Sequence, residues 1–377
     1  MLLQPTSDQE FFRETTDRFL ADKAPVDVLR GLRDDPAGFD DAYWRQGAEL
    51  GWTSLLVDEA RGGGSISDHG LVDLTLVAHE FGRHAAPGPL ISNNVVASAL
   101  SAAGAYADVV GELLAGTAIA TWCMAEAPPN DGPGDVLLEI HQDGDDVVLD
   151  GVKRPVEAGA HADHLLVTGR TGNGLTQVLV SADAEGVSVE PMQSVDLTRR
   201  FAVVRFDGVR VTGDAVVGQV GKADEDVERQ LQYALVLNTA ETTGAMQAAF
   251  DMTVEWAFDR YSFGRPLASY QALKHRFADM KSWLEASHAI SDEAATAVAT
   301  GSPDAARLTS AAKAYIGTFG AELAQDCVQL HGGIGVTYEH DLHLYLRRVV
   351  VNRGTHGTPE QHRRRLAAIV AHEEELG

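Results

Sequence analysis

The spacing of apolar residues changes period twice along this chain, and the change limits the folds that the sequence can adopt. In the first and last thirds, apolar residues recur at three- and four-residue intervals, which is typical of amphipathic helices. In the middle third the interval becomes two and short β-branched runs dominate, which is typical of strands. We therefore predict an α+β fold in three domains: an N-terminal helical domain (1–117), a middle antiparallel β-barrel or sandwich (118–220) and a C-terminal domain like a four-helix bundle (221–377).

Local signals support this division. Asp143-Gly144 separates two strand-like runs, and an Asp-Gly pair in that position predicts a β-hairpin. Strong turn residues such as Pro87-Gly88-Pro89 separate the helical segments of the first third. In the last third the apolar spacing predicts three long helices, over residues 230–261, 270–300 and 303–331.

The net charge of the 377-residue chain limits the classes of partner that it is expected to bind. The chain carries 55 acidic and 30 basic residues, a formal charge of −25, whereas nucleic acid and anionic membranes attract basic surfaces. The N-terminus, MLLQPTSDQEFF, has no basic region followed by an apolar run, so we expect no signal peptide. The longest weakly charged stretch, residues 88–107, is interrupted by polar residues and predicts a buried helix instead of a membrane span. These features predict a cytoplasmic enzyme or enzyme subunit.

Two long motifs in the last third carry the functional signal. The first begins at Arg260 and reads RYSFGRPLASYQALKHRFADM, and the second begins at Gln329 and reads QLHGGIGVTYEHDLHLYLR. Both resemble the signature sequences of the acyl-CoA dehydrogenase family, and the three-part periodicity is similar to the family's architecture. The resemblance covers essentially the whole chain. It implies a flavoprotein that uses FAD to oxidise an acyl-CoA thioester and passes the electrons to an acceptor protein.

The residue types in these motifs suit a flavin dinucleotide. Arg260 offers a forked cation for a phosphate, and Phe263 offers a flat apolar face. Adjacent glycines let main-chain groups approach a ligand closely. The bland alternative is that Gly332-Gly333 ends a helix and Arg260 pairs with a neighbouring acid. The resemblance assigns eight residues to flavin contacts across a subunit interface, which implies at least a dimer: Arg260, Ser262, Phe263, Tyr270, Gln271, Gln329, Gly332 and Gly333.

The catalytic carboxylate is missing from both positions where the family keeps it. Dehydrogenation of a thioester needs a base that removes the α proton in a dry pocket. The usual Glu before a Gly-Thr pair is His356 here, and the alternative position on the long helix is Ala234. Glu241 shares a helix face with Ala234, about 10 Å away, in an apolar run where an unpaired carboxylate is costly. We therefore predict Glu241 as the catalytic residue; the alternatives are a structural ion pair with an arginine, or His356 as a weaker base.

Two strands that contact the flavin in the resembling family also depart from its pattern. The usual Thr-Glu-Pro is Ala125-Glu126-Ala127, and a strand that normally carries Trp and Thr reads Pro155-Val156-Glu157. The contacts to the flavin ring are therefore less well preserved than those to the dinucleotide. The neighbouring His331, His340 and His343 belong to the second motif, which matches without a metal, so the sequence predicts no metal site.

Three functions are compatible with these motifs. The first is an FAD-dependent acyl-CoA dehydrogenase, acting as a homo- or hetero-oligomer on a fatty acyl or steroid side-chain thioester. The second is a non-catalytic subunit that completes the FAD site of a related chain in a mixed oligomer. The third is an acyl-CoA-binding protein without flavin, which the preserved flavin motifs disfavour.

Overall fold

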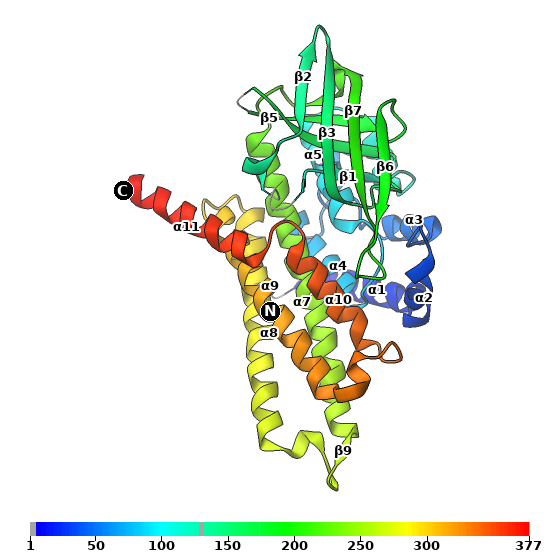
Figure 1. Ribbon diagram of the computed structural model, residues 1–377, viewed down its shortest axis with the longest axis vertical. Helices are drawn as coiled ribbons and strands as arrows, with labels where there is room; N and C mark the ends of the chain where they lie inside the picture. The colour runs from blue at the N-terminus through cyan, green and yellow to red at the C-terminus, as the bar shows by residue number, and fades with distance from the viewer. Residues whose placement is uncertain (1–4, 128–131, 173, 377) are drawn as a thin grey trace.

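The first part of the chain is helical, as predicted. The structure, a computed structural model, describes residues 5–127, 132–172 and 174–376 (Figure 1). A capping box begins the first helix. The Thr6 side chain accepts a hydrogen bond from the Gln9 backbone N–H, and the Gln9 side chain accepts one from the Thr6 backbone N–H. The helices are α1 (Ser7–Lys23), α2 (Val26–Gly31), α3 (Asp41–Glu49), α4 (Gly70–Arg83), α5 (Leu90–Ala103) and α6 (Ala107–Ala115).

The middle of the chain forms one connected sheet. Its strand order is β6-β7-β3-β2-β4-β5-β8, and β1 pairs with β4. The Asp143-Gly144 hairpin between β2 and β3 is confirmed. The prediction needs one correction: within the described residues the sheet is open, not a closed barrel, and β4 pairs in parallel with β1 and β2, so the sheet is mixed. The strands are β1 (Ala120–Cys123), β2 (Glu139–Asp143), β3 (Asp146–Glu157), β4 (His164–Thr171), β5 (Gly174–Ser181), β6 (Val187–Met192), β7 (Phe201–Thr212) and β8 (Val216–Val217).

The last part of the chain is again helical and contains the three predicted long helices. The first of them begins earlier than predicted, at an acidic turn that suits the positive end of the helix dipole. The α+β class is therefore confirmed. The helices are α7 (Asp224–Asp259), α8 (Gln271–Ala299), α9 (Ala305–His331), α10 (Leu342–Gly354) and α11 (Pro359–Leu376), and a short hairpin of β9 (Tyr261–Ser262) and β10 (Arg265–Pro266) joins α7 to α8.

Helices from the first and last parts of the chain pack directly on each other where α4 crosses α7. A Cβ on Gly82 would lie 1.8 Å from the Glu241 carbonyl oxygen, and one on Gly244 would lie 1.9 Å from the His79 carbonyl oxygen. Only glycine allows the two backbones to approach this closely. The two helical parts therefore share packing, and the division at 117 and 220 into separate domains stays a prediction.

None of the helices in the described part of the chain is both long enough and apolar enough to cross a bilayer.

Candidate functional site

The first motif forms an exposed hairpin at the end of the helical bundle that is remote from the sheet (β9 in Figure 1). Strands β9 and β10 pair through Ser262 and Arg265, and the turn between them is Phe263-Gly264, with φ of 50° and 78°. Two successive residues at positive φ make a tight hairpin turn. This turn presents the Phe263 ring, 98% exposed, to the surroundings.

Contacts within the motif fix the hairpin. The Tyr270 hydroxyl donates to the Ser262 carbonyl at 2.8 Å, and the Arg265 guanidinium carbon lies 3.8 Å from the centre of the Tyr270 ring. Arg260, directly after α7, and Gln271, at the start of α8, are both exposed. The polar and aromatic groups of the first motif therefore face outward together.

The second motif reaches the same end of the bundle through the C-terminus of α9. Gln329 is exposed on the last turn, and Gly332 follows the helix at φ 66° and ψ −139°, a conformation that favours glycine. Trp256 of α7 stacks on His331, with ring centres 5.3 Å apart, and this contact joins the two motifs. A Cβ on Gly332 or Gly333 would meet no atom within 4 Å, so the backbone here is open to an approaching group.

All eight residues assigned to flavin contacts thus gather at one end of the bundle, which we call the bundle end. An exposed guanidinium, an exposed aromatic ring and open main chain suit the pyrophosphate and rings of FAD. None of these residues lines the large cavity beside the sheet. Because α7 separates the two regions and spans about 54 Å, the bundle end is remote from this cavity. Its role in binding FAD stays a prediction.

A cavity of about 640 Å³ lies between the sheet and the turn that joins α10 to α11, and we call it the sheet cavity. An adjoining cavity of about 470 Å³ shares three lining residues with it, at the start of α11 and just before. Apolar side chains dominate the inner wall, as they do in most pockets that bind small molecules. The wall includes Ile91, Trp122, Met124, Met192, Phe201, Val350 and Val351.

Basic side chains lie where the two cavities meet. Arg364 lines both, and Arg365 lines the adjoining cavity and forms an ion pair with Glu228 of α7. Guanidinium groups bind phosphates through paired, charge-assisted hydrogen bonds. An apolar interior with a basic rim suits a ligand that joins an apolar acyl group to phosphates.

His356 lies in the wall of the sheet cavity, at φ 60°, with its ring 6.1 Å from the Trp122 ring. Burial and the nearby Lys313 lower the pKa of His356 to about 3. An imidazole with this pKa is neutral at physiological pH and is a poor acceptor of a substrate proton. His356 has access to the cavity, but this lowered pKa disfavours it as the base.

Glu241 is buried in an ion network and is not among the residues that line the sheet cavity. Its side chain is 3% exposed. Arg199 Nη1 donates to both carboxylate oxygens at 3.0 and 2.9 Å, Arg348 Nη1 donates to Oε1 at 2.6 Å, and Asn352 Nδ2 donates to Oε2 at 2.9 Å. This geometry matches the structural alternative of an ion pair with arginine. The catalytic assignment of Glu241 stays a prediction, which these contacts disfavour.

The network continues on both sides of Glu241. Arg348 Nε lies 2.6 Å from Asp196, and Arg199 Nη2 lies 2.5 Å from Glu157. Of these five charged groups, only Glu157 also lines the sheet cavity. Burial raises the pKa of Glu157, and Arg199 opposes that shift. The one network carboxyl on the cavity wall is thus bound to an arginine.

The pH dependence of the contribution from Glu241 can be predicted. Burial raises the pKa of Glu241, but Arg199 and Arg348 outweigh burial and hold it below the ordinary value of 4.5. A lowered pKa contributes stability that is present above the unfolded-state pKa and is lost as the pH falls through the folded-state pKa. We therefore expect wild type to have a higher free energy of unfolding than Glu241→Gln, measured with urea. This difference should be largest at pH 7 and smaller below pH 4. A difference that does not shrink in acid would contradict this prediction.

Sequence reasoning missed several members of these sites. Arg199 and Arg348 lie in different parts of the chain from Glu241, so no spacing connects them. Trp256 precedes the first motif by one helical turn, and that spacing could have indicated it. Glu157 appeared only as a departure in a strand, although a carboxylate beside β-branched residues is itself a signal of a buried charge.

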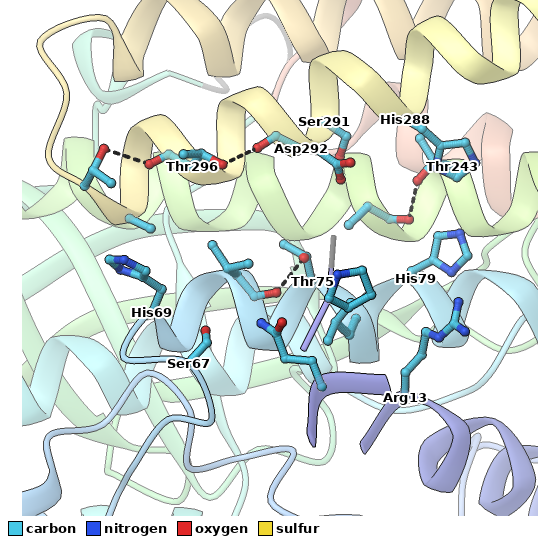
Figure 2. Close-up of a pocket in the computed structure, with 17 residues that line it drawn as sticks. Arg13, Ser67, His69, Thr75, His79, Thr243, His288, Ser291, Asp292 and Thr296 are labelled. Carbon is cyan, nitrogen blue, oxygen red and sulfur yellow. Dashed lines mark hydrogen bonds between the residues drawn. The ribbon is translucent and has the colours of Figure 1, made fainter. Parts of the chain in front are cut away.

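A third cavity, of about 230 Å³, lies among α1, α4, α7 and α8 (Figure 2). His79 of α4 and His288 of α8 both line it, with ring centres 5.5 Å apart. Burial, followed by His79, lowers the pKa of His288 to about 4, so this ring is neutral at physiological pH. The cavity shares no lining residue with the sheet cavity.

Comparison with known proteins agrees with this arrangement. The chain matches the family model "Acyl-CoA dehydrogenase, N-terminal domain" over residues 6–107 and "Acyl-CoA dehydrogenase, C-terminal domain" over residues 225–371. It is 30% identical over 370 residues to acyl-CoA dehydrogenase IpdE2 of Mycobacterium tuberculosis, covering 98% of this chain and 99% of that protein. It is 27% identical to the protein of the same name in Mycolicibacterium smegmatis, covering 97% of this chain and 99% of that protein.

Solved structures share the whole fold. Butyryl-CoA dehydrogenase of Megasphaera elsdenii superposes with a TM-score of 0.89 at 21% identity, covering 98% of this chain and all of that chain (100%). A variant of the steroid ACAD designated Tcur3481-Tcur3483 superposes with a TM-score of 0.88 at 27% identity, covering 97% of this chain and 98% of that chain.

Helices, an open sheet and a second set of helices, together with these matches, define the class of FAD-dependent oxidoreductases that act on acyl-CoA thioesters. Both family models and a relative matched over nearly its whole length lead to one assignment. The chain belongs to the acyl-CoA dehydrogenase family.

Proposed function

We propose that this chain takes part in the FAD-dependent α,β-dehydrogenation of an acyl-CoA thioester as one subunit of a mixed oligomer. In this role its bundle end completes the FAD site of a related chain. The observation that carries the proposal is the separation of two sites: the eight residues predicted to contact flavin lie at the exposed bundle end, whereas in the sheet cavity the carboxyl of Glu157 is paired with Arg199. The electrons then pass to an external acceptor protein.

The ionisable groups in and near the sheet cavity support the subunit role. Glu241 is bound by two arginines away from the cavity, and Glu157 is bound by Arg199 on its wall. His356 is neutral and weakly basic. A general base must reach the substrate proton and have a pKa suited to accepting it. Of these three groups only Glu157 both lines the cavity and has a raised pKa, and its carboxyl is paired with Arg199.

The residues of the bundle end suit half of an FAD site. Bound FAD would accept the hydride that leaves the β carbon of the thioester. In this chain, Arg260 would neutralise a phosphate, Phe263 would cover an aromatic ring, and Gly332-Gly333 would admit the dinucleotide close to the backbone. The 98% exposure of Phe263 fits a side chain that becomes buried against a second subunit.

The relatives support the proposal in two respects. The double designation Tcur3481-Tcur3483 names two components for one steroid ACAD. Its steroid substrate is bulky, and the sheet cavity here, at about 640 Å³ with a mainly apolar wall, has room for a bulky acyl group. A steroid or other bulky acyl thioester is therefore our proposed substrate class for the assembled enzyme.

The alternative is that this chain's own cavity carries out dehydrogenation with Glu241 as the base. One experiment separates the two: purify the chain alone and together with a co-expressed second member of the family, record visible spectra, and add bulky and linear acyl-CoAs without oxygen. We expect bleaching of the flavin band only in the two-chain complex. Bleaching by the single chain would overturn the subunit proposal, and loss of that bleaching in Glu241→Gln would establish the alternative.

A further inference from the structure

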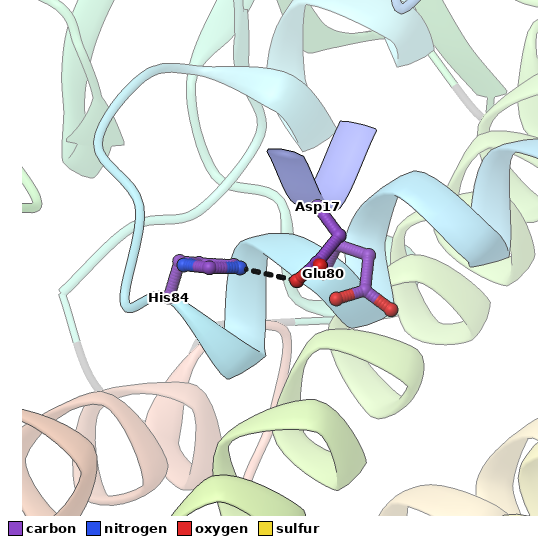
Figure 3. A group of neighbouring side chains, drawn as sticks. All are labelled: Asp17, Glu80 and His84. Atoms are coloured by element: carbon purple, nitrogen blue, oxygen red, sulfur yellow. Dashed lines mark hydrogen bonds and ion pairs between the residues drawn. The ribbon is translucent and has the colours of Figure 1, made fainter. Parts of the chain in front are cut away.

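Three side chains meet where the first helix packs on the fourth (Figure 3). Asp17 lies on α1, and Glu80 and His84 lie four residues apart on α4, so the latter two share a helix face. Each residue offers one ligand atom, and these three atoms lie within 4.8 Å of one another. The His84 Nε2 atom is 2.8 Å from Asp17 Oδ1. In the part of the chain that the structure describes, this is the one group of three or more His, Cys, Asp or Glu residues at metal-binding spacing.

Glu80 supplies the second, independent observation. Its side chain is 4% exposed, yet both of its ion pairs are long: His79 Nδ1 to Oε1 and Arg83 Nε to Oε2 each measure 3.4 Å. The buried Oε2 atom accepts no hydrogen bond. Buried carboxylates usually have close partners, because removing their charge from water is costly. Glu80 is thus a buried anion whose described contacts leave one oxygen without a close donor.

We propose that Asp17, Glu80 and His84 bind one divalent transition-metal ion of the zinc class, which joins α1 to α4. One imidazole nitrogen and two carboxylate oxygens are a ligand set that Zn²⁺ accepts, with a water completing a tetrahedron. Asp17 is 47% exposed and His84 is 20% exposed, so the site opens to solvent on one side. The ion would supply the close partner that Glu80 lacks.

A second histidine lies beside Glu80. His79 faces Glu80 Oε1 with its Nδ1 and also lines the 230 Å³ cavity of Figure 2. Residues that hold a metal ligand in place raise the affinity for the metal, typically by about 10- to 100-fold. The Arg83 guanidinium, 39% exposed, is the competing partner of Glu80 and has room to move away.

No sequence pattern connects these three residues, because Asp17 is distant in the chain from Glu80 and His84 and belongs to no motif. Two contacts already attach α1 to the rest of the protein: Gln9 donates to Asp73 at 2.8 Å, and Trp52 donates to Thr16 at 3.3 Å. A metal held by Asp17, the residue after Thr16, would attach the same helix at a point nearer its C-terminus.

The test is zinc binding by the whole chain after treatment with EDTA. Wild type is titrated with ZnCl₂ by calorimetry, its zinc content is measured after gel filtration, and its melting temperature is recorded with and without the metal. We expect one zinc more than in Asp17→Asn or His84→Gln, a Kd at least about tenfold weaker in each variant, and a rise in melting temperature with zinc in wild type only. His79→Phe should weaken zinc binding without removing the site.

The matched control is His141→Gln, which removes a histidine from an exposed His-carboxylate pair on β2, where Glu139 lies 3.1 Å away. It should bind zinc as wild type does. The proposal is overturned if wild type retains no zinc after gel filtration, or if Asp17→Asn and His84→Gln bind as much zinc, as tightly, as wild type. Both outcomes are independent of the flavin proposal, because the readouts require neither FAD nor activity.

Discussion

Replacing Arg348 by methionine is expected to lower the free energy of unfolding by about 3–5 kcal/mol. Arg348 is fully buried and holds Asp196 and Glu241, each at 2.6 Å, and it donates to the Ala86 carbonyl at 2.9 Å. Methionine fills similar space but removes one charged donor from each of two buried carboxylates and from the carbonyl oxygens of Ala85 and Ala86. Breaking a buried pair on one side leaves an uncompensated charge, which is why the expected loss is large. Urea and thermal unfolding measure it.

The matched control is Arg353→Met on the same helix. Arg353 is 45% exposed and lies 3.6 Å from Glu360, and exposed pairs of this kind contribute about 0–1 kcal/mol. If Arg348→Met were no more destabilising than Arg353→Met, the buried network would not be what joins α10 to the sheet and to α7.

Replacing Arg260 by methionine is expected to weaken FAD binding by the assembled oligomer about 10- to 100-fold. The proposed contact is a charge-assisted hydrogen bond to a phosphate, and such bonds contribute about 1.5–3 kcal/mol. Arg260 is exposed and forms no ion pair with another described residue. Its replacement should therefore leave the fold unaffected. FAD content after gel filtration and titration with added FAD measure the effect.

Arg229→Met is the control for this experiment, because Arg229 is an exposed arginine on α7, the helix that Arg260 follows, and forms an ion pair with Asp226 three residues away. It should keep wild-type flavin content. Retention of wild-type FAD affinity by Arg260→Met would remove the bundle end from the flavin site and, with it, the main support for the subunit proposal.

The sequence was most informative where local patterns determine structure. The α4 residues Leu71, Leu74, Val77 and Ala78, spaced as one helix face, are all buried. The Asp-Gly hairpin formed where its turn residues indicated. The openness of the sheet could not be predicted, because closure depends on which edge strands pair, and β6 and β8 carry no signal of their final neighbours.

The candidate site was only partly predictable, for the same physical reason. Contiguous motifs located all eight residues of the bundle end, since they lie on three adjoining segments. Glu241 was recognised as a buried carboxylate in an apolar run, but its partners come from the loop before β7 and from α10. A helix-face argument shows that a charge needs a partner; it does not show whether the partner is a substrate or an arginine.

The glycine crossing between α4 and α7 has a consequence for how the chain is made. The apolar face of α4 reaches its packing surface only after the whole sheet and half of α7 have left the ribosome. Until then, residues such as Leu76, which lines the cavity that α4 shares with α7 and α8 in the finished fold, stay without their native neighbours. Contacts between distant segments slow folding and prolong the exposure of apolar surface. Synthesis of this protein should therefore depend on chaperones that shield the newly made N-terminal helices, and truncation before α7 should give an insoluble fragment.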